Sequence, residues 1–368
     1  MPFLYMNICV LTPVILFGLL GNVLSMLTWS RGRHRNTSTA ALLTALAVMD
    51  TLVLAMPALE YWVLHVLNIW IRRSNIYACK VFGFASYFCP TSSSWIIVLV
   101  TAERLVSIWF PIRVRRVCTR TKMCLCMLLV WLVVAAVYSP FIVEAELFVE
   151  SDLNVTTCDL DKNGTFFIHF YAPLMWVDLC LLFMIPFILI VIANALILYK
   201  ILKSRRVFVR QCEYKSYRTR VANAFTIRAI VLSIFFLICL LPVSTYEVYY
   251  AYTVDNDALT RNICQILLYA NSALNFILYC VVGSGFRKDM KTVLLNLCTK
   301  KEVVCLDDHD GRSTSCVQQS LMNRNNKLPN SNCWYIMDVL YGCLFMQTIN
   351  NYFFIILTWL PPFKYSVR

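Results

Sequence analysis

Charged residues are scarce in this chain. Asp, Glu, Lys and Arg together make up 14% of its 368 residues, whereas an ordinary soluble domain holds about 25%. Hydrophobic residues make up 60%, and the mean hydropathy is +0.66. So little charge excludes an ordinary soluble domain and indicates a protein that lies in a membrane.

Motifs of the common hydrolases and nucleotide-binding enzymes are also missing. The sequence has four histidines and contains no HExxH, no GxSxG and no glycine-rich phosphate loop. These motifs supply a metal site, a nucleophile and a phosphate cradle, respectively. We therefore expect that the chain is not an enzyme.

Seven apolar windows follow one another along the chain. Each is long enough to cross a hydrocarbon core of about 30 Å as a helix. They cover residues 7–29, 39–64, 78–108, 123–143, 173–199, 222–250 and 259–282. A signal peptide is the alternative for the first window, but no basic segment precedes it, and we expect a retained span. The windows predict an all-α membrane protein built as a seven-helix bundle.

The net charge of +13 is distributed by topology. Arginine and lysine cluster after the first, third, fifth and seventh windows, whereas the loop between the fourth and fifth windows is acidic. By the positive-inside rule, the amino terminus is extracellular and the basic loops are cytoplasmic. The basic residues thus give no reason to expect a nucleic-acid partner.

The acidic outer loop carries two further marks of the extracellular side. Asn154 and Asn163 begin glycosylation sequons there, whereas the sequon at Asn36 falls in an inner loop and should stay unmodified. Cys79 and Cys158 are placed on the oxidising side, and a disulfide between them would hold the loop over the bundle. Two unrelated free thiols are the alternative.

Polar side chains stand at mid-membrane depth. Asp50 is in the second window, and Asn271 and Asn275 are four residues apart in the seventh, so they share one helix face. Asn22 occupies a similar depth in the first window, and the third window carries Thr91, Ser92, Ser93 and Ser94. An isolated carboxylate is costly there, so these groups should converge around Asp50. Simple hydrogen bonding between helices is the other interpretation.

These residues and their order resemble the rhodopsin-like G protein-coupled receptors. The resemblance covers about residues 8–298. The matching motifs are Gly21-Asn22, Leu46-Ala47 with Asp50, Glu103-Arg104-Leu105, Trp131, Pro186, Pro242, Asn275-Phe276-Ile277-Leu278-Tyr279 and the short amphipathic stretch 286–290. The Glu-Arg start and Asn-Phe-x-x-Tyr ending resemble invertebrate neuropeptide receptors of the FMRFamide-like and thyrotropin-releasing-hormone-like groups.

The resemblance implies a fold and a mechanism. A plasma-membrane receptor of seven helices and a short amphipathic eighth helix would signal to a heterotrimeric G protein, with arrestin and membrane lipid as further partners. Asp50, Ser93, Asn271 and Asn275 would form a sodium pocket, with no other cofactor. An ion pair of Glu103 with Arg104 would open to let Arg104 meet the G protein, with Pro242 and Tyr279 assisting activation. Cys298 would suit palmitoylation.

Four positions depart from the family pattern. Leu240 stands where a tryptophan usually precedes the proline of the sixth span, Phe276 replaces a proline, Asn194 replaces a tyrosine and Leu105 replaces another. These changes leave the fold intact and bear on how efficiently the G protein is activated.

The outer halves of the spans suggest the chemistry of the ligand. Ser86 and Tyr87 stand where amine receptors place an aspartate, and the seventh span has no lysine for retinal. Acids ringed by aromatic residues suit a cationic or amidated peptide. The candidate ligand residues are Glu60, Tyr61, Ser86, Tyr87, Asp178, Tyr246, Glu247, Tyr250, Gln265 and Tyr269. Anchoring at the membrane interface is the alternative role for them.

Two questions of organisation stay open at this point. A polytopic channel or transporter with a cation site at Asp50 is the alternative function. The chain divides into the receptor domain 1–298, a polar and disordered cytoplasmic tail 299–332, and an apolar segment 333–368. That last segment is either an eighth span or a stretch that does not cross the membrane.

Overall fold

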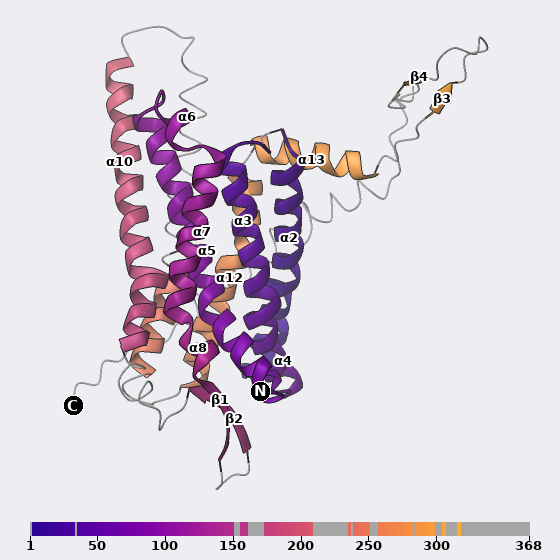
Figure 1. Cartoon of the computed structure of the whole chain (residues 1–368), viewed down its shortest axis with the longest axis vertical. Coiled ribbons are helices and arrows are strands. Elements are labelled where there is room, and N and C mark those ends of the chain that lie inside the picture. The colour runs from indigo at the N-terminus through magenta and orange to yellow at the C-terminus, as the bar shows by residue number, and fades with distance from the viewer. Residues whose placement is uncertain are drawn as a thin grey trace. The chain divides into compact units, whose positions relative to one another are not determined.

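The chain forms two compact units, of which the first holds all the predicted spans. The computed structural model describes residues 2–33, 35–150, 155–160, 173–208, 235–236, 238–250, 257–282, 284–298, 304–306 and 315–317. Residues Met1–Val293 form the first unit and Leu294–Arg368 the second. The long helices of the first unit run side by side (Figure 1).

The observed spans agree with the hydropathy windows. Among the described residues, six helices are long and apolar enough to cross a membrane: Phe3–Arg31, Ser38–Leu67, Ile76–Trp109, Arg120–Tyr138, Pro173–Lys203 and Ala258–Cys280. They correspond to the first five windows and the seventh. Of the sixth window, residues 235–236 and 238–250 are described, and these are helical.

The elements follow this order. The first span contains α1 (Pro2–Met6), η1 (Asn7–Leu11) and α2 (Thr12–Arg31), and the second contains α3 (Ser38–Val53), η2 (Leu54–Ala58) and α4 (Leu59–Leu67). The later spans contain α5 (Ile76–Trp109), α7 (Arg120–Tyr138), η4 (Leu179–Met184) with α10 (Ile185–Phe208), and α12 (Ala258–Val282). Shorter elements are η3 (Ile71–Arg73), α6 (Val114–Val117), α8 (Pro140–Val143), β1 (Ala145–Glu150), β2 (Val155–Leu160) and α13 (Ser284–Cys298). In the second unit, β3 (Val304–Leu306) pairs with β4 (Ser315–Val317).

Side-chain caps set the beginnings of three helices. Thr37 before α3, Asn75 before α5 and Thr119 before α7 each accept a hydrogen bond from the backbone N–H three residues further on. Such a cap satisfies one of the unpaired donors of the first helical turn. At the other end of the second span, α4 stops at Asn68, whose φ of 56° is left-handed and well tolerated by asparagine.

Three spans contain a π-helical turn beside a proline. Pro57 lies inside η2, whereas Pro13 and Pro186 are the second residues of α2 and α10, directly after η1 and η4. Proline lacks an N–H and crowds the preceding turn, so the helix must adjust its hydrogen bonding there. Two of the turns adjoin acids of the outer half, because Glu60 follows η2 and Asp178 precedes η4.

Two glycines let the first and seventh spans approach closely. A Cβ atom on Gly18 would lie 2.7 Å from the Cβ of Ala273, and one on Gly21 would lie 2.8 Å from the Cβ of Phe276. Real Cβ contacts are longer than this, so only glycine fits without a shift of α12. This close approach brings Asn22 of α2 against α12.

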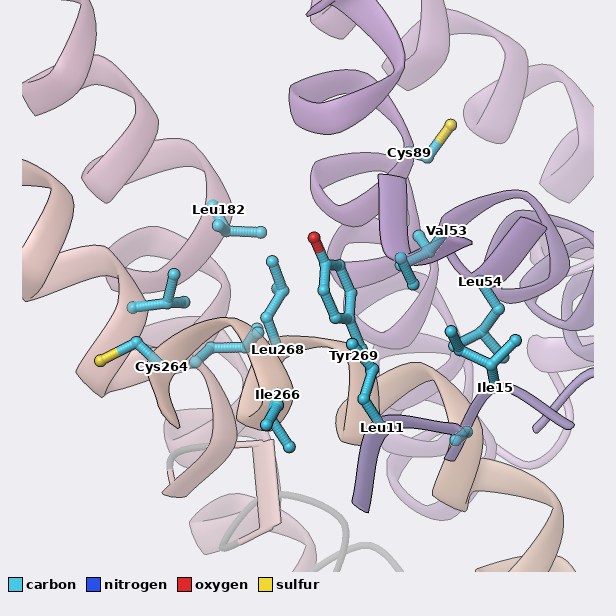
Figure 2. Close-up of a cluster of buried hydrophobic side chains, with 14 of the residues drawn as sticks. Leu11, Ile15, Val53, Leu54, Cys89, Leu182, Cys264, Ile266, Leu268 and Tyr269 are labelled. Carbon is cyan, nitrogen blue, oxygen red and sulfur yellow. The ribbon is translucent and has the colours of Figure 1, made fainter. Parts of the chain in front are cut away.

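Apolar side chains fill the space between the helices and also cover their outer face. Leu11 of η1, Val53 of α3, Cys89 of α5 and Leu182 of η4 lie around the ring of Tyr269 of α12 in one buried cluster (Figure 2). The outward face is apolar too, as expected where lipid rather than water is the solvent. Exposed members include Leu128, Leu129 and Leu132 on α7 and Ile188, Val191 and Ile192 on α10.

A β-hairpin that the sequence did not reveal closes the outer end. Strands β1 and β2 pair antiparallel, with Leu147 opposite Cys158. The hairpin lies at the same end as α4 and α8 (Figure 1). A disulfide joins Cys158 to Cys79 in the first turn of α5. The predicted bridge is therefore confirmed, and it ties the strand β2 of the acidic loop to α5.

Helix α13 is the predicted amphipathic eighth helix. Phe286, Met290 and Val293 recur at helical spacing and are buried, whereas Lys288 and Lys291 are exposed. The ring of Phe286 lies 5.2 Å from that of Trp29, so α13 is anchored to the inner end of α2.

Candidate functional site

Asp50 is the centre of a hydrogen-bonded cluster in the membrane core. The residue is 0% exposed, and each carboxylate oxygen has its own donor. The hydroxyl of Ser93 on α5 donates to Oδ1 at 2.7 Å, and the amide of Asn275 on α12 donates to Oδ2 at 2.7 Å. Asp50 thereby joins α3 to two other spans.

The neighbouring asparagines take different positions. Asn22 donates from α2 to the backbone carbonyl of Ser272 at 3.1 Å, which adds a fourth helix to the cluster. Asn271 is 6% exposed, but within the described part of the chain it makes no hydrogen bond to Asp50. The predicted convergence on Asp50 therefore holds for Ser93 and Asn275, which bond its carboxylate directly. Asn22 bonds the backbone of Ser272 on α12 instead.

This cluster explains how a carboxylate is tolerated at mid-membrane. A buried charge without partners costs several kcal/mol, and hydrogen bonds to an ionised oxygen are about twice as strong as neutral ones. Because the two donors come from different helices, the same bonds that stabilise Asp50 also fix the packing of the spans. Both sequence interpretations are therefore realised: polar groups converge on Asp50, and they link helices.

The inner end of α5 differs from the predicted ion pair. Glu103 accepts hydrogen bonds at Oε1 from Ser38 at 2.5 Å and from Thr39 at 2.8 Å, while its Oε2 is buried without a partner. Among the described residues, no ion pair within 4 Å joins Glu103 to Arg104, and the attraction between them acts at longer range. The predicted ion pair was wrong because the hydroxyls that begin α3 bind the carboxylate instead.

The charge of Glu103 also affects the pKa of a cysteine in the adjacent inner loop. Burial, followed by the charge of Glu103, raises the pKa of the Cys118 thiol above its ordinary value. A raised pKa keeps the thiol protonated at neutral pH, and we expect it to be a poor nucleophile.

At the outer end, Glu60 already has a cation from its own chain. Arg72 of η3 reaches back to Glu60 through its Nε at 2.5 Å and donates to the hydroxyl of Ser86 at 2.6 Å. The Glu60 side chain is 9% exposed and that of Arg72 is 33% exposed. The acid is therefore covered, and the arginine is the more accessible partner.

Glu247 has a looser environment. The amide of Gln265 donates to it at 3.3 Å, and Arg261 at the start of α12 interacts with it electrostatically without an ion pair within 4 Å in the described chain. The guanidinium of Arg261 lies 5.5 Å from the ring centroid of Tyr250. Of the three acids predicted to meet a ligand, Glu247 therefore has the weakest hydrogen-bonding partners among the described residues.

Asp178 is engaged between helices. It is 5% exposed and accepts a hydrogen bond from the hydroxyl of Tyr138 on α7 at 2.6 Å. The same hydroxyl lies 3.2 Å from Thr91 of α5. Three spans meet at this point, so Asp178 links the third, fourth and fifth spans much as Asp50 links the second, third and seventh.

Four of the predicted tyrosines form two groups: two are bonded to the outer end of α12, and two pack between spans. Tyr61 donates to Asn262 at 3.1 Å, and Tyr246 donates to the backbone of Asp257 at 3.3 Å, so both hold the outer end of α12. Tyr269 is buried and donates to the carbonyl of Pro57 at 3.3 Å. Tyr87 stacks on Phe141 of α8 with a ring separation of 4.4 Å, and so it faces the fourth span.

Three residues of the outer end were missed from the sequence. Arg72 and Arg261 place cations beside the acids, and Asn262 is fully buried with its amide nitrogen unpartnered. An arginine near the end of a span usually indicates only the topology of the protein. The sequence therefore gave no sign that Arg72 and Arg261 lie beside acids of the bundle. Asn262 lies nine residues before Asn271 on the same helix and could have been found as another polar residue within the span.

The departures from the family pattern are packed into the core. Leu240 is 1% exposed, and below it Phe236 stacks with Phe183 of η4 at a ring separation of 6.3 Å. Phe276 covers Gly21. Asn194 is buried on α10. Pro242 lies within the helical residues 238–250.

Some predicted sites lie outside the described residues. These are the sequons at Asn154 and Asn163, the tail 299–332 apart from β3 and β4, and the apolar segment 333–368. Cys298 ends α13, and its side chain is outside the described part as well. For these sites the predictions stay predictions.

Comparison with known proteins shows which proteins this chain is similar to. Residues 21–279 match the family model of the 7 transmembrane receptor (rhodopsin family). The chain is 26% identical over 299 residues to an FMRFamide receptor of Drosophila melanogaster, which covers 74% of this chain and 50% of that receptor. It is 23% identical over 299 residues to the thyrotropin-releasing hormone receptor of Gallus gallus, with 73% of each chain covered. It is 25% identical over 299 residues to the human growth hormone secretagogue receptor type 1, covering 75% of this chain and 77% of that receptor.

These matches agree with the helical order and with the motifs that the structure brings together. The alignment spans half the length of the Drosophila receptor and nearly three quarters of the chicken one. The family consists of receptors, which confirms that the chain is not an enzyme. Asp50, Ser93 and Asn275 on three adjoining spans, the Cys79–Cys158 bridge and the eighth helix all fall in one chain whose residues 21–279 fit one family model. The chain belongs to the rhodopsin family of seven-transmembrane receptors.

Proposed function

We propose that this chain is a plasma-membrane receptor with an extracellular amino terminus, which binds a peptide and activates a heterotrimeric G protein. Named relatives include receptors for FMRFamide and for thyrotropin-releasing hormone. The observation that carries the proposal is the outer end of the bundle, where acids and tyrosines of several spans meet within the receptor fold. A channel is disfavoured, because the fully buried Asp50 lines no open path.

The ligand group that fits best is a cation or an amide held at Glu247. Glu60 is neutralised by Arg72 and Asp178 is bonded to Tyr138, whereas Glu247 has one weak neutral donor and a more distant arginine. The ring of Tyr250 adds an aromatic face close by. Arg72 and Arg261 supply the opposite charge, which suits a peptide that carries both an acidic and a basic group.

The inner end supplies the surface for the G protein. Arg104 on α5 and the basic loops lie at this end, together with Tyr279, whose ring packs 5.7 Å from Phe286 of α13. Glu103 is bonded to the two hydroxyls of α3 through Oε1, and its Oε2 has no partner among the described residues. Release of Oε1 would change the electrostatic field around the neighbouring Arg104. Arrestin would use the same surface.

The Asp50 cluster fits a sodium ion by the chemistry of its donors. A hard cation prefers oxygen ligands, and one carboxylate offsets its charge. Asp50, Ser93 and Asn275 would hold the ion through their side-chain oxygens. The ion would supply a positive charge that replaces the hydrogen-bond donors now on Asp50.

A peptide screen tests the proposal. Cells that express the full chain would be exposed to amidated peptides with basic residues, and calcium and cyclic AMP would be recorded. We expect a saturable response, which Arg104→Ala abolishes while surface expression stays largely intact. A response unchanged by Arg104→Ala would contradict the role of this residue.

The acids provide matched variants for the ligand contact. Glu247→Gln keeps size and hydrogen bonding but removes the charge, and we expect it to raise the half-maximal peptide concentration by about tenfold, as a lost charge-assisted bond of about 1.5–3 kcal/mol implies. Glu60→Gln should change it less, because Arg72 already neutralises that acid. Equal shifts for both would show that Glu247 has no special role.

A further inference from the structure

A groove at the inner end of the first unit lies between α13 and the loop that follows α2. It has a volume of about 440 Å³ and is lined by Arg33, Gly285, Lys288, Asp289, Lys291 and Thr292, all of which belong to the first unit. Helix α13 passes the inner end of α2 (Figure 1), and a Cβ atom on Gly32 of the loop would lie 3.5 Å from the Cβ of Asp289. The loop and the helix therefore form one continuous surface.

The lining of the groove is mainly basic. Arg33, Lys288 and Lys291 are positively charged at neutral pH, and Asp289 is the one acid among the six lining residues. Arg33 and Lys288 are exposed, and among the described residues neither of them forms an ion pair. Three positive charges and one negative charge give the lining a net charge of +2, which suits an anionic group.

Thr292 places a hydroxyl group beside these cations. It is exposed and lies four residues after Lys288, so the two side chains share one face of α13. Its Oγ1 donates to the backbone carbonyl of Lys288 at 3.0 Å, which is a bond within the same helix. In the described chain the hydroxyl joins α13 to no other element, so it is available for modification without loss of a contact between helices.

The sequence before Thr292 suits a kinase that recognises basic residues. Arg287, Lys288 and Lys291 all precede it within five residues, and kinases select their substrates partly by such charge patterns. The positive-inside rule places the loop and α13 in the cytosol, where kinases and ATP are found. Kinases bind extended segments, so the end of α13 after Met290 has to open first, and helix ends open more easily than helix centres.

We propose that Thr292 is a phosphorylation site and that its phosphate joins α13 to the loop after α2. The cations that hold the phosphate are Lys288 and Lys291 on the helix and Arg33 in the loop. A phosphate on threonine carries a charge of about −1.5 to −2 at neutral pH and three acceptor oxygens, and opposite basic residues it forms charge-assisted hydrogen bonds. Repulsion from Asp289 opposes this binding, but the three cations outweigh one carboxylate.

The modification is an ordinary phosphoryl transfer from ATP. The bond between the γ-phosphorus and the oxygen that bridges it to the β-phosphate breaks, and a bond from that phosphorus to Oγ1 of Thr292 forms. The hydroxyl proton passes to the catalytic base of the kinase, and ADP leaves. The product removes about two positive charges from the inner surface and fixes the loop to α13.

Phosphorylation of the purified full chain tests the site. The receptor in phosphatidylcholine nanodiscs would be incubated with the catalytic fragment of protein kinase C, Mg²⁺ and ATP, and the modified residues would be identified by tandem mass spectrometry. We expect phosphate on Thr292, which Thr292→Val abolishes because it keeps the shape of the side chain and removes the hydroxyl. Thr299→Val is the matched control, because Thr299 lies on the same tryptic peptide, and it should leave the phosphorylation of Thr292 unchanged.

The acidity of the phosphate tests where it is held. Its second proton would be titrated by phosphorus NMR in the phosphorylated full chain. Nearby cations favour the doubly charged phosphate, so we expect that proton to be about tenfold more acidic in the wild type than in Arg33→Gln. Arg31→Gln is the control, because Arg31 is exposed at the end of α2 but does not line the groove, and it should titrate like the wild type.

Three results would overturn the proposal. Phosphate on other residues but not on Thr292 would exclude the modification. The same titration in the wild type, Arg33→Gln and Arg31→Gln would mean that the groove does not hold the phosphate. Phosphorylation of Thr292 that is blocked by phosphatidylinositol bisphosphate in the nanodisc would mean that a lipid headgroup occupies the groove instead. These measurements need no peptide and no G protein, so their failure is distinguishable from failure of the proposed function.

Discussion

The membrane core and the outer mouth handle buried acids in different ways. In the core, Asp50 is bonded by neutral donors, Ser93 and Asn275, which belong to helices. At the mouth, Glu60 is bonded by Arg72, a charged and partly exposed residue of a loop. The difference teaches that the core cluster is part of the helix packing, whereas the mouth pair rests on a partly exposed arginine outside the spans.

The largest effect should come from removing the core acid. Asp50→Leu keeps the branching and the number of heavy atoms of the side chain but leaves the Ser93 hydroxyl and the Asn275 amide unpaired, at about 1–3 kcal/mol each. We expect a clear drop in the unfolding temperature of the purified receptor. Asp50→Asn is the control, because an amide still accepts from Ser93, and it should cost less. A Leu variant as stable as the Asn variant would contradict the claim that the hydrogen bonds to Asp50 stabilise the bundle.

The disulfide at the mouth should have the next largest effect. Loss of a bridge typically costs about 2–4 kcal/mol. Cys79→Ser and Cys158→Ser should impair surface delivery of a tagged receptor to the same extent, and the double variant should be no worse than either. Unequal effects would argue that the hairpin is held by other contacts.

Asp178 is intermediate between the two regions, since it is buried like Asp50 but accepts a hydrogen bond from one donor among the described residues, Tyr138. Tyr138→Phe removes that donor and should lower stability by about 1–3 kcal/mol. Adding Asp178→Leu should recover part of the loss, because the unpaired acid is then gone. The measurement is the thermal unfolding of the three variants. No recovery in the double variant would mean that Tyr138 acts by packing alone.

The smallest stability effect should come from the mouth pair. Arg72→Ala breaks a partly exposed ion pair, worth about 0.2–1 kcal/mol. Its larger consequence should be functional, because Glu60 becomes available to a cationic ligand group. Peptide dose–response curves would then shift more with Glu60→Gln in the Arg72→Ala background than in the wild type. A shift of equal size in both backgrounds would contradict the proposed shielding.

The core cluster was predictable because helix geometry fixes both depth and face. Asp50 and the asparagines of the seventh span could be placed near mid-membrane from the sequence, and their meeting follows once the spans pack. The third span offered Thr91, Ser92, Ser93 and Ser94 at this level, and the choice of Ser93 among them came from the family resemblance. The Cys79–Cys158 bridge followed from topology in the same way.

The mouth was less predictable because loops decide it. Nothing in the local sequence indicates that Arg72 folds back onto Glu60, or that Ala145–Glu150 pairs with Val155–Leu160. At the inner end, Glu103 was expected to pair with its neighbour Arg104, but consecutive residues on a helix point in different directions. The hydroxyls of Ser38 and Thr39 are close in space and distant in sequence, so only the packed structure reveals them.

A pair of double-mutant cycles on thermal stability tests the central claim most directly. One cycle combines Asp50→Ala with Asn275→Ala, and the other combines Glu60→Ala with Arg72→Ala. The account predicts a coupling free energy of about 1–3 kcal/mol for the core pair and below about 1 kcal/mol for the mouth pair. A core coupling near zero, or one smaller than that of the mouth pair, would contradict it.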